Sequence, residues 1–182
     1  MKTLKNISSN QSGSSMIEVL VTLIILLVGL LGLAGLQLQA QRSEMESYQR
    51  VQALVLLQDM VGRISASHLN AASYVASVGT GDATTTAAAC AALATIPARD
   101  LCEWSIALKG AAEAGNTGAM IGGRGCVTYD AASSVAMVSV AWQGLGDTVA
   151  PPASLTCGSG QYGAETKRRV VNMPVTFGCL TC

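Results

Sequence analysis

The chain has 182 residues and a formal net charge of +0, with 12% of its residues charged and 50% hydrophobic. This length suits one compact domain plus an extension. Because there is no excess of positive charge, the composition argues against nucleic acid as the main partner.

A short polar segment, residues 1–13, carries Lys2 and Lys5 and ends at Gly13. An uninterrupted apolar run over residues 19–36 follows, with Glu18 at its head. As a helix the run would be about 27 Å long, close to the hydrocarbon thickness of a bilayer. A charge at the edge of such a segment is costly and usually functional, so Glu18 is a candidate site residue.

Three interpretations of this N-terminal region compete. A secretory signal has a shorter apolar region and a small-x-small cleavage site, whereas the candidate site here begins with Leu38. A lipoprotein signal would need Cys where Leu36 stands. The third interpretation places a cut after Gly13, which would make Ser14 the first residue and Glu18 the fifth.

The helix is predicted to continue through residues 37–66 and to be about 75 Å long in all. Glycines recur at every third position inside the apolar run, at Gly29, Gly32 and Gly35. They could permit close helix approach, soften the helix or simply be tolerated, and the pattern does not separate these readings. Farther along, an apolar stripe with a period near 3.6 requires a covering surface, for which a sheet is the simplest candidate: Ala53, Leu54, Leu57, Met60, Val61 and Ile64.

The remainder is predicted to be mixed. Residues 69–100 read as linker and loops with a short helix over 87–93, and residues 100–109 as a helix with Asp100 near its cap. A glycine-rich loop over 110–125 precedes strands at 126–129, 135–143 and 169–178, separated by a turn at 130–134 and a long loop at 144–163. Trp104 and Trp142 are expected in the core. Pro174 indicates an edge strand or a bulge.

The basic cluster of residues 167–169 reads as a solvated strand start or as a contact for an acidic partner such as another protein or DNA. No nucleophile motif, phosphate loop or paired-carboxylate motif is recognisable, so no enzymatic activity is expected.

Six cysteines form an even set, typical of disulfides in an exported domain: Cys90, Cys102, Cys126, Cys157, Cys179 and Cys182. Fifteen pairings are possible and the sequence does not choose among them. We expect Cys90 with Cys102 and Cys179 with Cys182 from proximity along the chain, and Cys126 with Cys157. The C-x-x-C at 179–182 lacks the second ligand pair of a zinc site and the following helix of a redox site, so a plain bridge is favoured over a metal or cofactor.

A small residue at the cut, a basic leader and Glu18 as fifth residue match the type IV prepilin signal. Residues 16–21 after Gly13 resemble the start of a pilin or pseudopilin. Segments 28–37, 123–126, 140–144 and 168–171 resemble the PilV family of minor pilins, also called type IV pilus modification proteins. The resemblance covers the first third of the chain strongly and the rest in patches. Ser14 departs from the aromatic residue or Met usual at the new N-terminus.

The resemblance implies an α+β pilin-like fold, in which a long N-terminal helix packs on a small antiparallel sheet. Residues 1–13 would be a removed leader, 14–41 the transmembrane or filament-core helix, 42–67 its amphipathic half, and 68–182 a disulfide-containing head. Without Lys2 and Lys5 the mature chain would be slightly acidic.

The resemblance further implies a non-enzymatic minor pilin that primes type IV pilus assembly in a tip complex with other minor and major pilins. A prepilin peptidase would cut after Gly13 and methylate Ser14. The chain would span the inner membrane once, with its head in the periplasm, and would meet the assembly platform there before reaching the pilus and cell surface. The alternatives are a type II secretion pseudopilin and a pilus-tip adhesin or DNA-binding module.

Cleavage would leave a protonated α-amine on Ser14. Glu18 lies about one helical turn away and could meet this amine on a neighbouring subunit, which would set the axial register of the assembly. The alternative is a carboxylate that only stabilises the helix N-terminus through the macrodipole, by about 0.3–1 kcal/mol.

Overall fold

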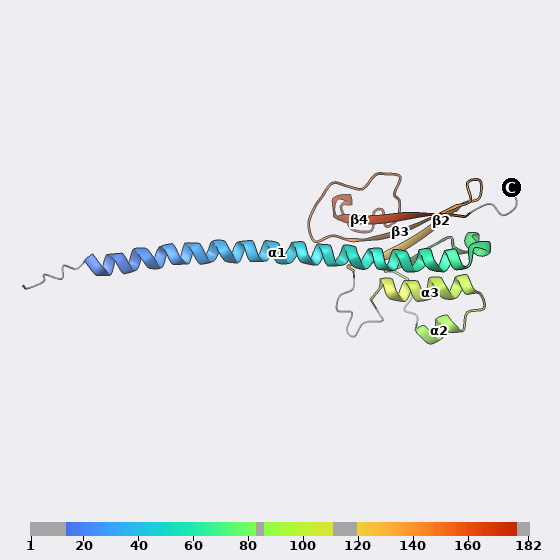
Figure 1. Cartoon of the computed structure of the whole chain (residues 1–182), viewed down its shortest axis with the longest axis horizontal. Coiled ribbons are helices and arrows are strands. Elements are labelled where there is room, and N and C mark those ends of the chain that lie inside the picture. The colour runs from blue at the N-terminus through green and yellow to red at the C-terminus, as the bar shows by residue number, and fades with distance from the viewer. Residues whose placement is uncertain (1–13, 83–85, 111–119, 178–182) are drawn as a thin grey trace, which may run out of the picture. The chain divides into compact units, whose positions relative to one another are not determined.

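The computed structural model describes residues 14–82, 86–110 and 120–177 (Figure 1). The chain divides into two compact units, one ending at Ser43 and one beginning at Glu44. A single helix, α1 (Ser14–Ala66), contributes residues to both units.

Among the described residues of the second unit, four strands form an antiparallel sheet in the order β1-β2-β3-β4. The strands are β1 (Ala76–Gly79), β2 (Arg124–Asp130), β3 (Val135–Gln143) and β4 (Arg168–Thr176). Figure 1 shows β3 between β2 and β4, which leaves Pro174 on an edge strand where its missing N–H does least harm. The predicted α+β class, a long N-terminal helix with a small antiparallel sheet, is confirmed.

Residues of α1 from Ala53 onward form one side of the hydrophobic core. Ala53, Leu57, Met60 and Ile64 are fully buried, as the apolar stripe predicts. They share a core with buried residues from the other elements: Ala71, Tyr74, Trp104, Leu108, Met120, Val127, Ala136, Val138, Val140, Trp142 and Val175. The inclusion of Leu54 in the stripe is wrong, because the 100° step from Ala53 turns its side chain toward solvent, where 37% of it is exposed.

Trp104 is the largest fully buried side chain, and a glycine makes its position possible. Its indole Nε1 donates to the carbonyl of Leu56 on α1 at 2.9 Å. A Cβ at Gly125 on β2 would overlap the Trp104 ring. The prediction that Gly125 lies in a loop is wrong, because it is a strand glycine that admits the close approach of an aromatic ring.

The prediction that residues 69–100 start as linker and loops is wrong, and so is the predicted start of the next helix at residue 100. This stretch includes a 3-10 helix, η1 (His68–Tyr74), and strand β1, which pairs with β2. Helix α3 (Ile96–Leu108) begins earlier than predicted, because the Thr95 hydroxyl accepts from the Ala98 N–H and caps it. The short helix α2 (Ala87–Ala91) is capped in the same way by Thr86.

Asp100 therefore lies inside α3, where it joins three elements instead of capping one. Arg63 of α1 donates to Asp100 at 2.8 Å and to Glu103 at 2.7 Å, and Tyr74 of η1 donates to the other oxygen of Asp100. Burial, together with the hydrogen bond to Asp100, raises the pKa of Tyr74 to about 12. Figure 1 shows the result, with α3 running alongside the C-terminal half of α1.

The basic cluster at the start of β4 is mostly internal, so its interpretation as a solvated strand start is wrong. The Arg168 side chain is 3% exposed and donates to Glu165 in the short helix η3 (Glu165–Lys167) and to the carbonyls of Leu155 and Cys157. Arg169 donates to Glu46 of α1 at 2.6 Å. Both guanidinium groups are needed inside the fold, because they satisfy acceptors that the long 144–163 loop and α1 bring to this end of the sheet.

We expect the 144–163 loop to loosen in acid. Hydrogen bonds from the Gly160 N–H and from Arg168 hold the pKa of Glu165 below its ordinary value of 4.5. A carboxyl with a lowered folded-state pKa stabilises the fold above 4.5, and this contribution is lost as the pH falls through the folded value. Hydrogen exchange of the Gly160 amide, corrected for its intrinsic rate, should show stronger protection near pH 6 than at a pH well below 4.5. In Glu165→Gln the Gly160 amide should be weakly protected at both pH values. Equal protection of this amide in the native chain at both pH values would contradict the assignment of Glu165 as its acceptor.

Candidate functional site

The first unit contains the part of α1 that lies before Glu44, and its side chains are unusually apolar and exposed. Its large hydrophobic residues from Met16 to Leu38 each expose about half or more of their surface. The helix has a stretch with a mean hydropathy of 2.9, none of it buried, and is long and apolar enough to cross a membrane. Such a surface requires cover from lipid or from other protein.

Glu18 is the only charged side chain between Ser14 and Gln41, and it is exposed. Thr22, close by on the same helix, satisfies its own hydroxyl by donating to the Val19 carbonyl at 2.9 Å. Among the residues that the structure describes, Glu18 has no hydrogen-bond or ion-pair partner. The carboxylate is thus open to a group outside the described chain.

The predicted cut lies at the helix start. Ser14 is the first residue of α1, whereas Gly13 lies outside the described residues. Cβ atoms added at Gly29, Gly32 and Gly35 would meet nothing within 4 Å. The reason for these glycines therefore does not lie in packing within the described chain.

Two disulfides stabilise the second unit. Cys90 of α2 is bonded to Cys102 of α3, and Cys126 of β2 to Cys157 of the 144–163 loop. These are two of the three pairs named in the sequence analysis; the third, Cys179 with Cys182, lies outside the described residues. Cross-links closing loops of this size stabilise a fold by about 3–4 kcal/mol each in the chain-entropy picture.

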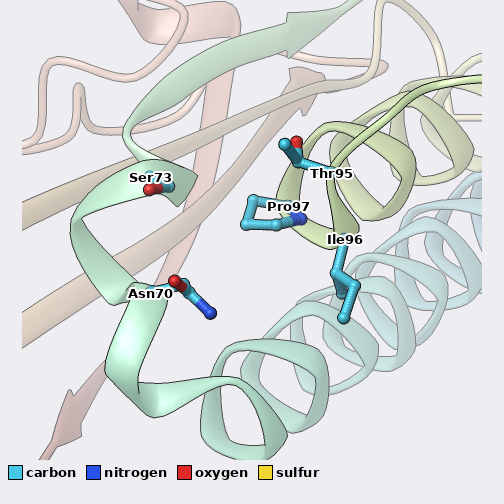
Figure 2. Close-up of a pocket in the computed structure, with 5 residues that line it drawn as sticks. All are labelled: Asn70, Ser73, Thr95, Ile96 and Pro97. Atoms are coloured by element: carbon cyan, nitrogen blue, oxygen red, sulfur yellow. The ribbon is translucent and has the colours of Figure 1, made fainter.

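Two surface pockets lie among the described residues of the second unit. One, of about 190 Å³, lies between η1 and the start of α3, and Figure 2 shows the Asn70 side chain directed toward Ile96 and Pro97. Another, of about 420 Å³, lies beside β1, β2 and residues 156–158. Among the described residues neither is lined by a charged side chain, and no group of three or more His, Cys, Asp or Glu could hold a metal ion. His68 is exposed.

Two comparisons with known families bear on this arrangement. The family model described as the prokaryotic N-terminal methylation motif matches residues 8–34, which include Gly13, Ser14 and Glu18. The one described as type IV pilin Tt1218 matches residues 35–107, from the middle of α1 into α3. No curated protein and no solved structure matches the chain.

An apolar N-terminal helix, a prepilin methylation motif and a small antiparallel sheet with a disulfide on β2 support a type IV pilin. More particularly, residues 35–107 are similar to the pilin Tt1218. These findings support a pilus-related function and membrane anchoring by the N-terminal helix. They also support contacts with other pilins and with the prepilin peptidase.

Proposed function

We propose that this chain is a minor pilin of the PilV type, which primes type IV pilus assembly within a tip complex of minor pilins. It begins as an inner-membrane precursor with its head in the periplasm. The prepilin peptidase cuts after Gly13 and methylates Ser14, and the assembly platform transfers the chain into the pilus. Its role is structural, not enzymatic.

The observation that carries the proposal is the position of Glu18. It is exposed, it is the only carboxylate on α1 before Glu44, and it has no partner in the described chain. On insertion scales an unpaired charge at the centre of a membrane-spanning helix costs about 2.5–3.5 kcal/mol, which is an upper bound for Glu18 at the head of the apolar run. Cleavage after Gly13 creates a positive α-amine, and the Ser14 amine of a neighbouring subunit would offset that cost. The pairing favours docking and sets the axial register.

Apolar cover is the second part of the proposal. A helix leaves lipid only where another surface of similar character replaces the lipid contacts. The exposed apolar residues of α1 before Glu44 can pack against the N-terminal helices of neighbouring pilins, which would replace the lipid contacts.

The mature N-terminus tests the proposal directly. Intact-mass spectrometry of the protein from its own membranes should show a chain that begins at Ser14 and carries one methyl group. A variant with Asp in place of Gly13 should retain residues 1–13, because the peptidase requires a small residue at the cut. A native chain that keeps Met1, or one that begins beyond Leu38, would contradict the proposal.

A DNA-binding role receives no support from the basic cluster that suggested it. Arg168 and Arg169 are engaged inside the fold, which leaves Lys167 exposed. Nucleic acid requires several cations on one face.

A further inference from the structure

Helix α1 meets the rest of the second unit through a polar turn. Every residue over 15–45 is exposed, Glu46 is partly buried, Gln49 is buried, and the apolar stripe begins only at Ala53. Glu46, Gln49 and Ala53 are spaced by three and four residues, so they lie on one face of the helix. The turn over residues 46–52 therefore contributes little hydrophobic burial to the head.

Buried polar atoms in this turn and on the sheet lack hydrogen-bond partners. The side-chain oxygens of Gln49 and Gln52 are buried without a partner in the described chain, and so is the indole Nε1 of Trp142. Trp142 belongs to the same core as Ala53. A buried polar atom without a partner costs free energy, because its hydrogen bond to water is not replaced. Packing alone is thus a weak hold on residues 46–52.

An ion pair supplies the contact that packing does not. Arg169 of β4 donates to one oxygen of Glu46 from Nε at 2.8 Å and from Nη2 at 2.6 Å. The same guanidinium donates to the carbonyls of Thr166 and Gly146, both at 2.9 Å. Arg169 stands opposite Trp142 in the β3–β4 register, so the two side chains share a face of the sheet. The guanidinium therefore joins α1, β4 and the 144–163 loop beside Trp142.

The position of this guanidinium depends on a residue without a side chain. A Cβ at Gly144 would lie 2.6 Å from Arg169 Cζ and 2.7 Å from its Nη2. Because the guanidinium is the far end of a flexible side chain, an added methyl group would displace it and leave the backbone in place. The contact to Glu46 can thus be broken in two independent ways, at Arg169 and at Gly144.

We propose that Arg169 is a positioning residue, which acts through Glu46 to hold residues 46–52 of α1 against the sheet and to keep Trp142 covered. Without this contact the turn opens, whereas the apolar stripe from Ala53 onward stays packed. Entry into the pilus then suffers, because a surface that opens must be ordered again before it docks on a neighbouring pilin. This last step rests on the proposed function.

Hydroxyl-radical labelling of the full chain in detergent, read by mass spectrometry, reports the exposure of each tryptophan separately. Trp142 is 2% exposed in the native chain and Trp104 is fully buried. In both Arg169→Met and Gly144→Ala, labelling of Trp142 should rise by about fivefold or more. Labelling of Trp104 should change by less than about twofold, because the rest of the core stays closed.

Three further variants make the test specific. Arg169→Lys keeps the charge but not the planar fork, so its labelling of Trp142 should lie between those of the native chain and Arg169→Met. Lys167→Met removes an exposed cation from the same basic cluster. Gly62→Ala adds a Cβ that meets nothing within 4 Å. The last two variants should be labelled like the native chain.

Sheared-pilus fractions test the second step. Arg169→Met and Gly144→Ala should be about fivefold less abundant in pili than the native chain, with normal amounts in the membrane and a mature N-terminus at Ser14. Arg169→Lys should restore part of this loss, and Lys167→Met should assemble like the native chain.

Unchanged labelling of Trp142 in both Arg169→Met and Gly144→Ala would overturn the inference. Labelling of Trp104 that rises together with that of Trp142 would also overturn it, since the whole head would then be unfolding. Native amounts of an opened variant in pili would overturn the positioning role. Absence of the native chain itself from sheared pili would contradict the proposed function, whereas the labelling would still decide what the contact to Glu46 does.

Discussion

Replacing Glu18 by Ala should leave the precursor inserted and cut but reduce its amount in sheared pili by about tenfold or more. The reason is that the variant presents no carboxylate to the α-amine of the neighbouring subunit. Leaving one member of a buried ion pair without its partner costs about 3–5 kcal/mol, ample for an effect of this size. Immunoblots of membrane and sheared-pilus fractions measure it, and the mature mass confirms cleavage.

Glu44→Ala is the matched control. Glu44 is another exposed glutamate on α1, but it lies beyond the apolar segment. The Glu44→Ala variant should therefore reach the pili at the native level. Glu18→Gln keeps the side-chain shape and removes only the charge, so it should behave like Glu18→Ala. If Glu18→Ala reaches the pili at the native level, the ion-pair mechanism is wrong and the macrodipole interpretation of Glu18 is favoured.

Replacing Trp104 by Ala should destabilise the head by about 3–5 kcal/mol, a large part of the 5–15 kcal/mol typical of a folded domain. The change leaves a cavity at the meeting point of α1, α3 and β2, and it removes the hydrogen bond to the Leu56 carbonyl. Thermal unfolding of the full chain in detergent, followed by circular dichroism, should show a clearly lower midpoint. In cells the steady-state amount of the variant should fall, since unfolded chains are degraded.

The control for Trp104 is Leu69→Ala. Leu69 is also a large apolar residue, but it is 86% exposed, so its loss should change the unfolding free energy by no more than about 0.5 kcal/mol. If the Trp104→Ala head unfolded at the same midpoint as the Leu69→Ala head, this would contradict the burial of the Trp104 ring against Gly125.

Errors in predicting the head share a physical cause. β1 has four residues and no periodicity of its own, and it is a strand because β2 pairs with it. Asp100 has the residue type of a helix cap, but Thr95 caps α3 and Asp100 binds Arg63, which lies 37 residues earlier. Arg169 has the residue type of a solvated strand start, but it donates to Glu46, which lies 123 residues earlier in the chain.

The sequence by itself determined the apolar helix, the position of Glu18 at its head, the cut predicted at Gly13 and the core-facing stripe of α1. These are properties of neighbouring residues, since hydropathy, helical period and spacing are all local. Only the tertiary structure decided which cysteines pair in the described head, which arginines are buried, and that a strand glycine admits Trp104. Those outcomes depend on contacts between residues distant in the chain, and a side chain's own chemistry does not reveal what the fold will place beside it.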